Sequence, residues 1–180
     1  MKSPEKEIVA TLCYSDIFDF PLTAPEIYRY LIAKKSVSYE KVIQQLSKKS
    51  SFFSRANKFF YLSGRKYIVE ERMKKGRISK RKLQKAQKMS RFLSLIPTIL
   101  FIGVSGSLAM KNAKGNADID FFIITKKDSV WITRFCCFLF LSVFGKRRKR
   151  NENNPKDTIC LNMLIDESHL AFPQKKQNIY

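Results

Sequence analysis

The feature that most constrains the fold is the stretch GVSGSLAMKNAKGNADIDFFIIT, residues 103–125, in which two apolar runs flank a glycine–serine turn. The run TILFIGV that leads into the turn is short and rich in β-branched residues, which is typical of a buried strand. The second run, ADIDFFIIT, has the same character but carries Asp118 and Asp120 at its start. We therefore expect a strand, a turn, a short helix and a second strand here. Neither strand needs those polar residues in order to pack.

Asp118 and Asp120 stand two positions apart on the expected strand, so both carboxylates project from the same face. They repel each other unless a cation lies between them, and Mg²⁺ or Mn²⁺ prefers such oxygen ligands. At Gly106 and Ser107, free backbone N–H groups and the serine hydroxyl would hold phosphate oxygens, and glycine lets the ligand approach closely. The pattern predicts a metal- and phosphate-binding site. An ordinary turn followed by a polar strand entry is the alternative, although an unpaired mid-strand Asp120 is costly.

The order of apolar strand, Gly-Ser, about ten residues and Asp-x-Asp within an apolar strand resembles the signature of the DNA polymerase beta-like nucleotidyltransferase superfamily. The resemblance implies Mg²⁺- or Mn²⁺-dependent transfer of a nucleoside monophosphate from a nucleoside triphosphate to a hydroxyl or phosphate acceptor. By the same resemblance, Gly106 and Ser107 hold the triphosphate, while Asp118 and Asp120 are the catalytic metal ligands. The signature covers residues 103–125. The looser resemblance, to an uncharacterised prokaryotic group with an N-terminal winged-helix-like region, covers most of the chain.

The chain departs from this family where active members carry a third carboxylate on a following strand. In DTICLNMLIDESHL, the expected third strand, the mid-strand polar residue is Asn162, which is neither a base nor a strong metal ligand. Asp166 lies four residues farther on, about 13 Å at the usual strand rise, and Asp157 precedes the strand. Either the strand register differs, or Asp166 or Asp157 substitutes for the third carboxylate, which commonly deprotonates the acceptor, or the acceptor supplies its own activation. Asp166 is also a candidate metal ligand. A nucleotide-binding protein with little or no transferase activity is a further alternative, so whether the chain is an enzyme stays open. His169, the only histidine, follows in an expected loop with no catalytic partner in the sequence pattern, so we do not predict a catalytic role for it.

Residues 1–63 carry the order of a winged-helix domain. Three segments with helical spacing of apolar residues, EKEIVATLCYSDIF, TAPEIYRYLI and SVSYEKVIQQLSKKS, precede the pieces SFFSR and KFFYLSG, which are able to form a hairpin. Thr23, with Glu26 three residues on, predicts the start of the second helix. Many small helical domains share this order, and such domains also serve as protein-docking modules.

The third helical segment is the candidate nucleic-acid contact. With Val42, Ile43 and Leu46 turned inward, it would expose residues suited to phosphate and base contacts, namely Lys41, Gln44, Gln45 and Lys48. The formal net charge of +20 also favours polyanionic partners. The alternative function is therefore a nucleic-acid-binding regulator whose transferase fold is degenerate and binds nucleotides only.

Residues 64–97 predict a basic linker helix with a break at Gly76 and a restart near Ser79. Ten Lys or Arg residues and no acid lie between Arg72 and Arg91, and like charges four residues apart repel. An apolar side remains at Leu83, Ala86, Phe92, Leu93 and Leu95. A solvated linker and a nucleic-acid track both fit this pattern.

Residues 98–180 form the expected nucleotidyltransferase-like domain, a small mixed sheet that is truncated at its C-terminus if the segment AFPQKKQNIY begins a further helical region. The whole chain is thus predicted to be α+β. Residues 128–144 predict a helix that covers the sheet, because the run is interrupted by Arg134 and falls short of the roughly 20 apolar residues that span a bilayer. We expect no membrane partner. Four unpaired cysteines and a charged N-terminus predict a reduced, cytoplasmic protein.

Overall fold

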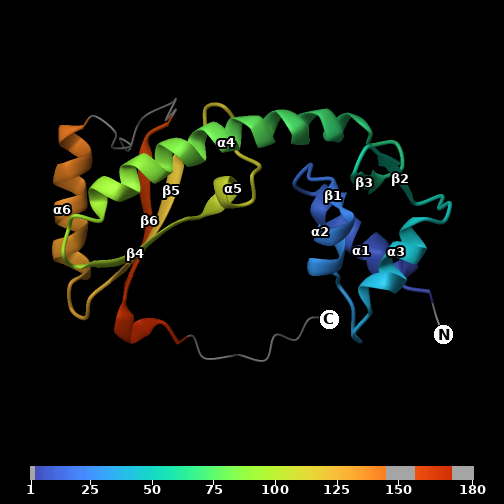
Figure 1. Ribbon diagram of the computed structural model, residues 1–180, viewed down its shortest axis with the longest axis horizontal. Coiled ribbons are helices and arrows are strands. Elements are labelled where there is room, and N and C mark those ends of the chain that lie inside the picture. Colours follow the sequence, from blue (N-terminus) through green and yellow to red (C-terminus); the bar gives the residue numbers. More distant parts are fainter. Residues whose placement is uncertain (1–2, 145–156, 172–180) are drawn as a thin grey trace. The chain divides into compact units, whose positions relative to one another are not determined.

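The computed structural model describes residues 3–144 and 157–171 of the 180-residue chain. It is a mixed α+β protein, as predicted, with its helices and strands coloured along the chain in Figure 1. The elements are α1 (Glu5–Asp16), β1 (Leu22–Thr23), α2 (Ala24–Arg29), α3 (Tyr39–Leu46), β2 (Phe53–Ala56), β3 (Phe59–Leu62), α4 (Tyr67–Leu93), β4 (Ile99–Val104), α5 (Gly106–Ala109), β5 (Ile119–Thr125), α6 (Val130–Val143), β6 (Ile159–Asp166) and the 3-10 turn η1 (Glu167–His169).

The chain divides into two compact units, and the division falls between Lys74 and Lys75, within α4. The prediction of a break at Gly76 is wrong, because α4 runs unbroken through it. A glycine inside a helix costs only about 1 kcal/mol relative to alanine, which packing on either side of it readily offsets. The start of α4 packs Ile68 and Val69 against strand β3 of the first unit, whereas Ala86 and Leu93 enter the core of the second.

The first unit contains a three-stranded antiparallel sheet in the order β1-β3-β2. The predicted hairpin is confirmed as β2 and β3, joined by a turn in which Asn57 adopts a positive φ of 53°. Strand β1 was not predicted from the sequence, because its two residues are defined only by their pairing with Phe59 and Phe60. The core of this unit joins buried side chains of all three helices, including Ile8, Ile27 and Val42.

Helix α2 begins at the predicted Thr23–Glu26 cap. The Thr23 backbone N–H and hydroxyl donate to one Glu26 oxygen at 2.8 and 2.9 Å, and Arg72 donates to the other at 2.9 Å. Arg72 is buried and lies 3.4 Å from the centre of the Phe20 ring. Arg72, the first cation of the basic run in α4, therefore lies in a buried ion pair and not in solvent.

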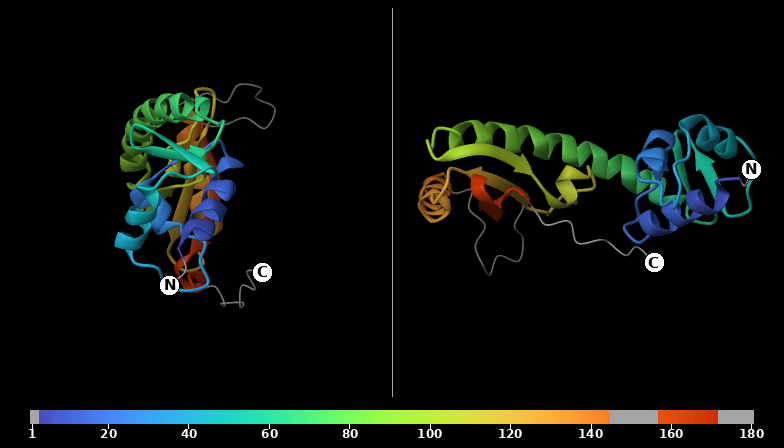
Figure 2. Two further views of the ribbon diagram at one scale, coloured as in Figure 1. Left: turned by 90° about the vertical axis from the view of Figure 1, so that its right-hand side faces the viewer. Right: turned by 90° about the horizontal axis from the view of Figure 1, so that it is seen from below.

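The second unit is built on a mixed sheet in the order β4-β5-β6, in which β4 and β5 are antiparallel and β5 and β6 are parallel. The three predicted strands, the short helix after Gly-Ser and the helix within residues 128–144 are confirmed. Alternate residues of β5, Ile119, Phe121 and Ile123, are buried in a core that α4 and α6 complete. The intervening residues of β5, which include Asp120, therefore lie on the other, open face of the sheet. Figure 2 shows the same elements from two further directions.

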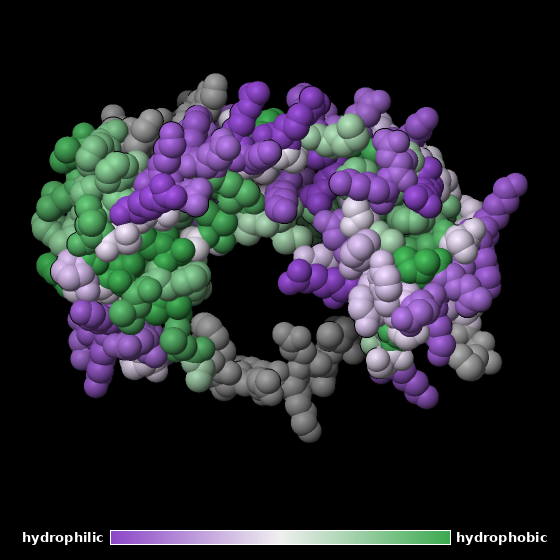
Figure 3. All heavy atoms as spheres, viewed as in Figure 1, coloured by the Kyte–Doolittle hydropathy of each residue, from purple (hydrophilic) through white to green (hydrophobic). Residues whose placement is uncertain are grey.

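Helix α6 packs on the core through one stripe, Thr133, Cys137 and Leu141, all of which are buried. Its other side is apolar and exposed, with Trp131 81% accessible and Val143 83% accessible. Figure 3 shows apolar side chains gathered over this helix and the sheet, whereas hydrophilic side chains follow α4. Within residues 3–144 and 157–171, no helix combines the length and the apolar character required to cross a membrane. Segments 145–156 and 172–180, which include the basic run after α6 and the predicted truncated end, lie outside the described residues.

Candidate functional site

The Gly-Ser turn and the Asp-x-Asp strand lie in direct contact at one end of the sheet. Ser105 follows β4 and donates its backbone N–H to the Asp120 carbonyl at 2.9 Å. Gly106, which begins α5, has a φ of +62°. A Cβ built on Gly106 would lie 2.6 Å from the Asp120 Oδ2 atom. Glycine is therefore required at this position both for its backbone conformation and for the close approach of the carboxylate.

Three potential metal ligands cluster beside this turn: Asp118, Asp120 and Cys160 each offer a donor atom, and the three donor atoms lie within 4.8 Å of one another. All three residues are half-buried. The parallel register of β5 and β6 explains the cluster, because it places Cys160 opposite Asp120 on the same face of the sheet. Sequence reasoning missed Cys160. No local signal marks it, because its place opposite Asp120 depends on how β5 pairs with β6.

Asn162 lies at a register shift in β6 and is exposed. Phe121 pairs with Leu161 and Phe122 with Met163, so Asn162 is the extra residue between them. Its Nδ2 atom donates to the Ser105 Oγ at 3.3 Å, which ties β6 to the turn between β4 and α5. The register shift brings no carboxylate of β6 to this end of the sheet, so it does not supply the third carboxylate that the resemblance implies.

Asp157, one proposed substitute for the third carboxylate, is engaged by two lysines of α4. Lys82 Nζ donates to Asp157 Oδ1 at 2.9 Å and to the Ala117 carbonyl at 2.6 Å, and Lys85 binds the other carboxylate oxygen. Burial raises the pKa of Asp157, but hydrogen bonds from Lys85 and Lys82 outweigh it and lower the pKa below its ordinary value. Because Ala117 directly precedes Asp118, this contact fixes the entry into the Asp-x-Asp strand.

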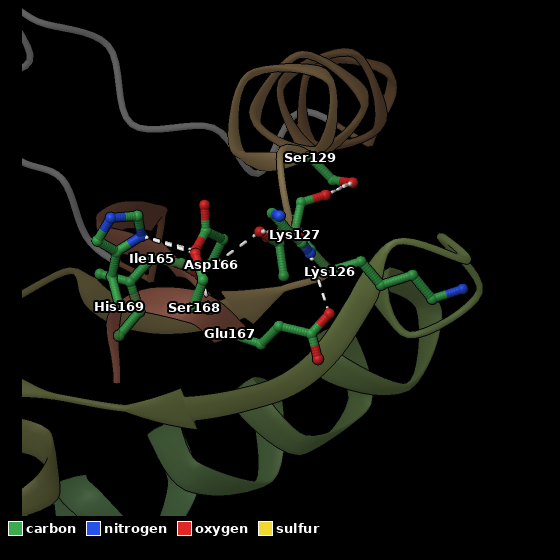
Figure 4. A network of polar contacts seen from close by, with 9 residues as sticks. Lys126, Lys127, Ser129, Ile165, Asp166, Glu167, Ser168 and His169 are labelled. Atoms are coloured by element: carbon green, nitrogen blue, oxygen red, sulfur yellow. Dashed lines mark hydrogen bonds and ion pairs between the residues drawn. The ribbon is translucent and has the colours of Figure 1, made fainter. Parts of the chain in front are cut away.

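Asp166, the other proposed substitute, lies at the far end of the sheet. It pairs with Thr125, five residues along β5 from Asp120, which is about 17 Å at the usual rise. Figure 4 shows that Ser168 and His169 point toward its carboxylate. The Asp166 Oδ1 atom accepts from the Ser168 backbone N–H at 3.0 Å and lies 2.8 Å from His169 Nδ1. Asp166 therefore caps η1 and does not join the metal-ligand cluster, so the prediction of a metal-binding Asp166 is not supported by its position.

The cap at Asp166 predicts an acid-sensitive contribution to stability. Hydrogen bonds from the Ser168 hydroxyl and the His169 ring lower the pKa of Asp166 to about 2. Because the folded-state pKa is below the unfolded one, the contribution is present above about pH 4 and is lost as the pH falls through about 2. In urea titrations, Asp166→Asn should therefore unfold at lower urea than the wild type at pH 6, and the two should converge near pH 2. The exposed Asp128→Asn is the control. A constant difference between Asp166→Asn and wild type across this range would contradict the assignment.

The α3 candidates for nucleic-acid binding do not all lie on one exposed face. Lys41, Gln44 and Lys48 are exposed, whereas Gln45 is buried and its Oε1 accepts from the Ser3 hydroxyl at 2.8 Å. Ile43 is exposed, although the sequence predicted that Ile43 would point inward and Gln45 outward. The exposed side of α3 borders a surface pocket of about 480 Å³, whose lining includes Ile43 of α3, Ser47 at the end of this helix, and Arg55 and Lys58 from the hairpin.

Comparisons of this chain with protein-family models, with curated proteins and with solved structures found no match. The geometry of the residues themselves must therefore carry any functional assignment.

Proposed function

We propose that this protein is a metal-dependent nucleotidyltransferase, which transfers a nucleoside monophosphate from a nucleoside triphosphate to an acceptor, in the cytoplasm. The observation that carries the proposal is the close approach of the Asp120 carboxylate to Gly106, where an added Cβ would lie only 2.6 Å from Asp120 Oδ2. It joins the turn that follows β4 to the carboxylates at the start of β5, the antiparallel neighbour of β4. A phosphate-binding turn and metal-binding carboxylates side by side are what phosphoryl chemistry requires.

The donor chemistry of Asp118 and Asp120 fits Mg²⁺ or Mn²⁺, because both ions prefer carboxylate oxygens. When bound, such an ion neutralises phosphate charge and orients the phosphates. Both aspartates are half-buried on the open face of the sheet, so a solvated ion with phosphate ligands has access to them.

The turn offers polar groups for a triphosphate beside the carboxylates. Gly106 and Ser107 are exposed beside the carboxylates, so the serine hydroxyl and the turn can face phosphate oxygens. Asn162 holds the turn through Ser105, and Lys82 holds the strand entry through Ala117. Two strands and one helix thus fix the site on a rigid frame. Neither Asp157 nor Asp166 is placed to deprotonate an acceptor, since the first is paired with lysines and the second lies at the far end of the sheet.

The fold we propose for each unit follows from its topology. In the first unit, helix, short strand, two helices and a hairpin, with β1 paired beside β3, support a winged-helix domain. In the second unit, the mixed sheet with its glycine turn and Asp-x-Asp strand supports a nucleotidyltransferase fold of the DNA polymerase beta-like kind.

Transfer of label tests the proposed activity. Purified chain is incubated with Mg²⁺, an α-phosphate-labelled nucleoside triphosphate and, in separate reactions, RNA, protein or small-molecule fractions as acceptors. We expect covalent labelling of one acceptor class, lost in Asp118→Asn/Asp120→Asn and retained in Asp128→Asn. Labelling that is equal in the double variant and the wild type would show that a different site, or a contaminant, is responsible.

A nucleic-acid-binding regulator is the second candidate, favoured by the exposed Lys41 of α3 and Lys48 just after this helix. Two further exposed cations of the hairpin, Arg55 and Lys58, line the pocket that Ile43 of α3 also lines. Neutralising phosphates with these side chains releases counterions, so binding should weaken steeply with salt. Lys41→Ala/Lys48→Ala should lower the salt slope for duplex DNA by about 2. The exposed loop pair Lys34→Ala/Lys35→Ala is the control, and an unchanged slope in the α3 variant would exclude this face.

A further inference from the structure

The metal-ligand cluster contains one sulfur among carboxylate oxygens, and this sulfur changes which ions the cluster favours. Cys160 lies on strand β6, where it pairs in parallel register with Asp120 of β5. Its sulfur and one oxygen each from Asp118 and Asp120 lie within 4.8 Å of one another. Asp120 and Cys160 lie opposite each other on the paired strands β5 and β6, and Asp118 directly precedes β5.

The mixed donor set distinguishes between classes of ion. Mg²⁺ takes oxygen ligands almost without exception, so a thiol contributes nothing to its binding. Zn²⁺ accepts thiolate and carboxylate together, and sites with three protein ligands leave a fourth position for water or another ligand. Mn²⁺ ranks below Zn²⁺ for such a site, since affinity rises along the first-row series.

The other acids and cysteines of the second unit do not offer an alternative third donor in the described part of the chain. Asp157 is bound by Lys82 and Lys85, and Asp166 caps η1 at the far end of the sheet. Cys137 of α6 is buried in the core. In residues 3–144 and 157–171, the cluster with Cys160 is the one group of three or more such side chains in reach of a common ion.

We propose that Cys160 is the third protein ligand of this site and that Asp118, Asp120 and Cys160 together bind Zn²⁺ more tightly than Mg²⁺. On binding, the thiol releases its proton to solvent and the sulfur bonds to the metal as thiolate. The proposal deepens the proposed function by naming the ion that the same site selects, and it rests on that function only in taking Asp118 and Asp120 as metal ligands.

The proposal is tested by titrating the full chain with Co²⁺ and Cd²⁺. Both ions report a thiolate ligand through sulfur-to-metal charge-transfer absorption in the ultraviolet. Wild type should develop the band with one equivalent of metal, and Zn²⁺ should displace it while equimolar Mg²⁺ does not. Cys160→Ser should lose the band. Asp118→Asn should weaken Co²⁺ binding at least about tenfold, because the loss of a residue that only supports a metal ligand already lowers metal affinity by about 10-fold or more. The exposed Cys13→Ser should retain the band in full.

A second variant separates loss of the ligand from loss of the fold. Cys160→Asp should lose the charge-transfer band yet bind Mg²⁺ more tightly than the wild type, because it restores an all-oxygen set. Circular dichroism identical to that of the wild type establishes that each variant is folded. Absence of the band in folded wild type, or its survival in Cys160→Ser, would overturn the proposal.

The outcome is distinguishable from failure of the proposed function. If Mg²⁺-dependent nucleotide binding requires Asp118 and Asp120 but the wild type gives no thiolate band, only the role of Cys160 is wrong. If the thiolate band appears and depends on all three ligands while no nucleotide binds, the metal site stands and the transferase assignment is wrong.

Discussion

Replacing Gly106 with alanine is expected to reduce Mg²⁺-dependent nucleotide binding by about 100-fold or more. The added Cβ would lie 2.6 Å from Asp120 Oδ2, closer than non-bonded atoms tolerate, so the carboxylate or the turn must move. The φ of +62° adds strain of about 1–2 kcal/mol for alanine. Displacements of about 1 Å in a reacting site cost on the order of 100-fold in rate, and we expect a loss of similar size in the binding of a triphosphate that contacts both the turn and the metal ion. Equilibrium binding of each common nucleoside triphosphate with Mg²⁺ measures the effect.

Gly64→Ala is the matched control for this substitution. Gly64 also has a positive φ, +87°, but a Cβ built there meets no atom within 4 Å. The control therefore carries the backbone strain without the contact to a carboxylate, and it lies in the first unit. We expect Gly64→Ala to lower stability but to leave nucleotide binding unchanged. Equal binding by wild type and Gly106→Ala would mean that the turn and Asp120 do not act together.

Replacing Lys82 with methionine is expected to destabilise the second unit by about 3 kcal/mol. The Lys82 side chain is 3% exposed and donates to both Asp157 and the Ala117 carbonyl. Removing one partner of a buried ion pair leaves the other charge and, here, a carbonyl without their donor, which typically costs about 3–5 kcal/mol. Lys85 still contacts Asp157, so we expect the lower end of that range. Urea unfolding followed by circular dichroism measures the change.

Lys85→Met, which removes the second lysine bound to the Asp157 carboxylate, serves as the comparison. Its side chain is 57% exposed, and an exposed ion pair is worth at most about 1 kcal/mol. A Lys82→Met chain as stable as Lys85→Met would contradict the role assigned to the buried lysine. Hydrogen exchange in residues 117–125 should also rise in Lys82→Met alone, because Ala117 precedes the Asp-x-Asp strand.

The regular elements of the second unit could be predicted from sequence because short β-rich runs and the 3.6-residue period of α6 are local signals. The Gly-Ser turn and the Asp-x-Asp pair were also local signals, since parity alone places Asp118 and Asp120 on one face. Cys160 was not found, because its place opposite Asp120 depends on the register between β5 and β6, which no short segment encodes. The same register, shifted at Asn162, places Asp166 beside Thr125 and away from the cluster.

In the first unit, the helices and the hairpin were predictable, whereas the inward side of α3 was predicted only in part. Val42 and Leu46 are buried as expected, but Gln45 takes the inner position given to Ile43. The hydrogen bond from Ser3, forty-two residues away in sequence, satisfies the buried amide and makes this arrangement favourable. Gly76 misled the prediction for a related reason, because its helical conformation depends on packing before and after it.

The most direct test of the central claim is equilibrium titration of the purified chain with each nucleoside triphosphate, with and without Mg²⁺, beside the Asp118→Asn/Asp120→Asn variant. We predict binding that requires Mg²⁺ and is weakened at least about 100-fold in the double variant, because two charged metal ligands are lost together. The exposed Asp128→Asn should bind as the wild type does. Binding of equal strength by the double variant, or binding indifferent to Mg²⁺, would contradict the assignment of this site.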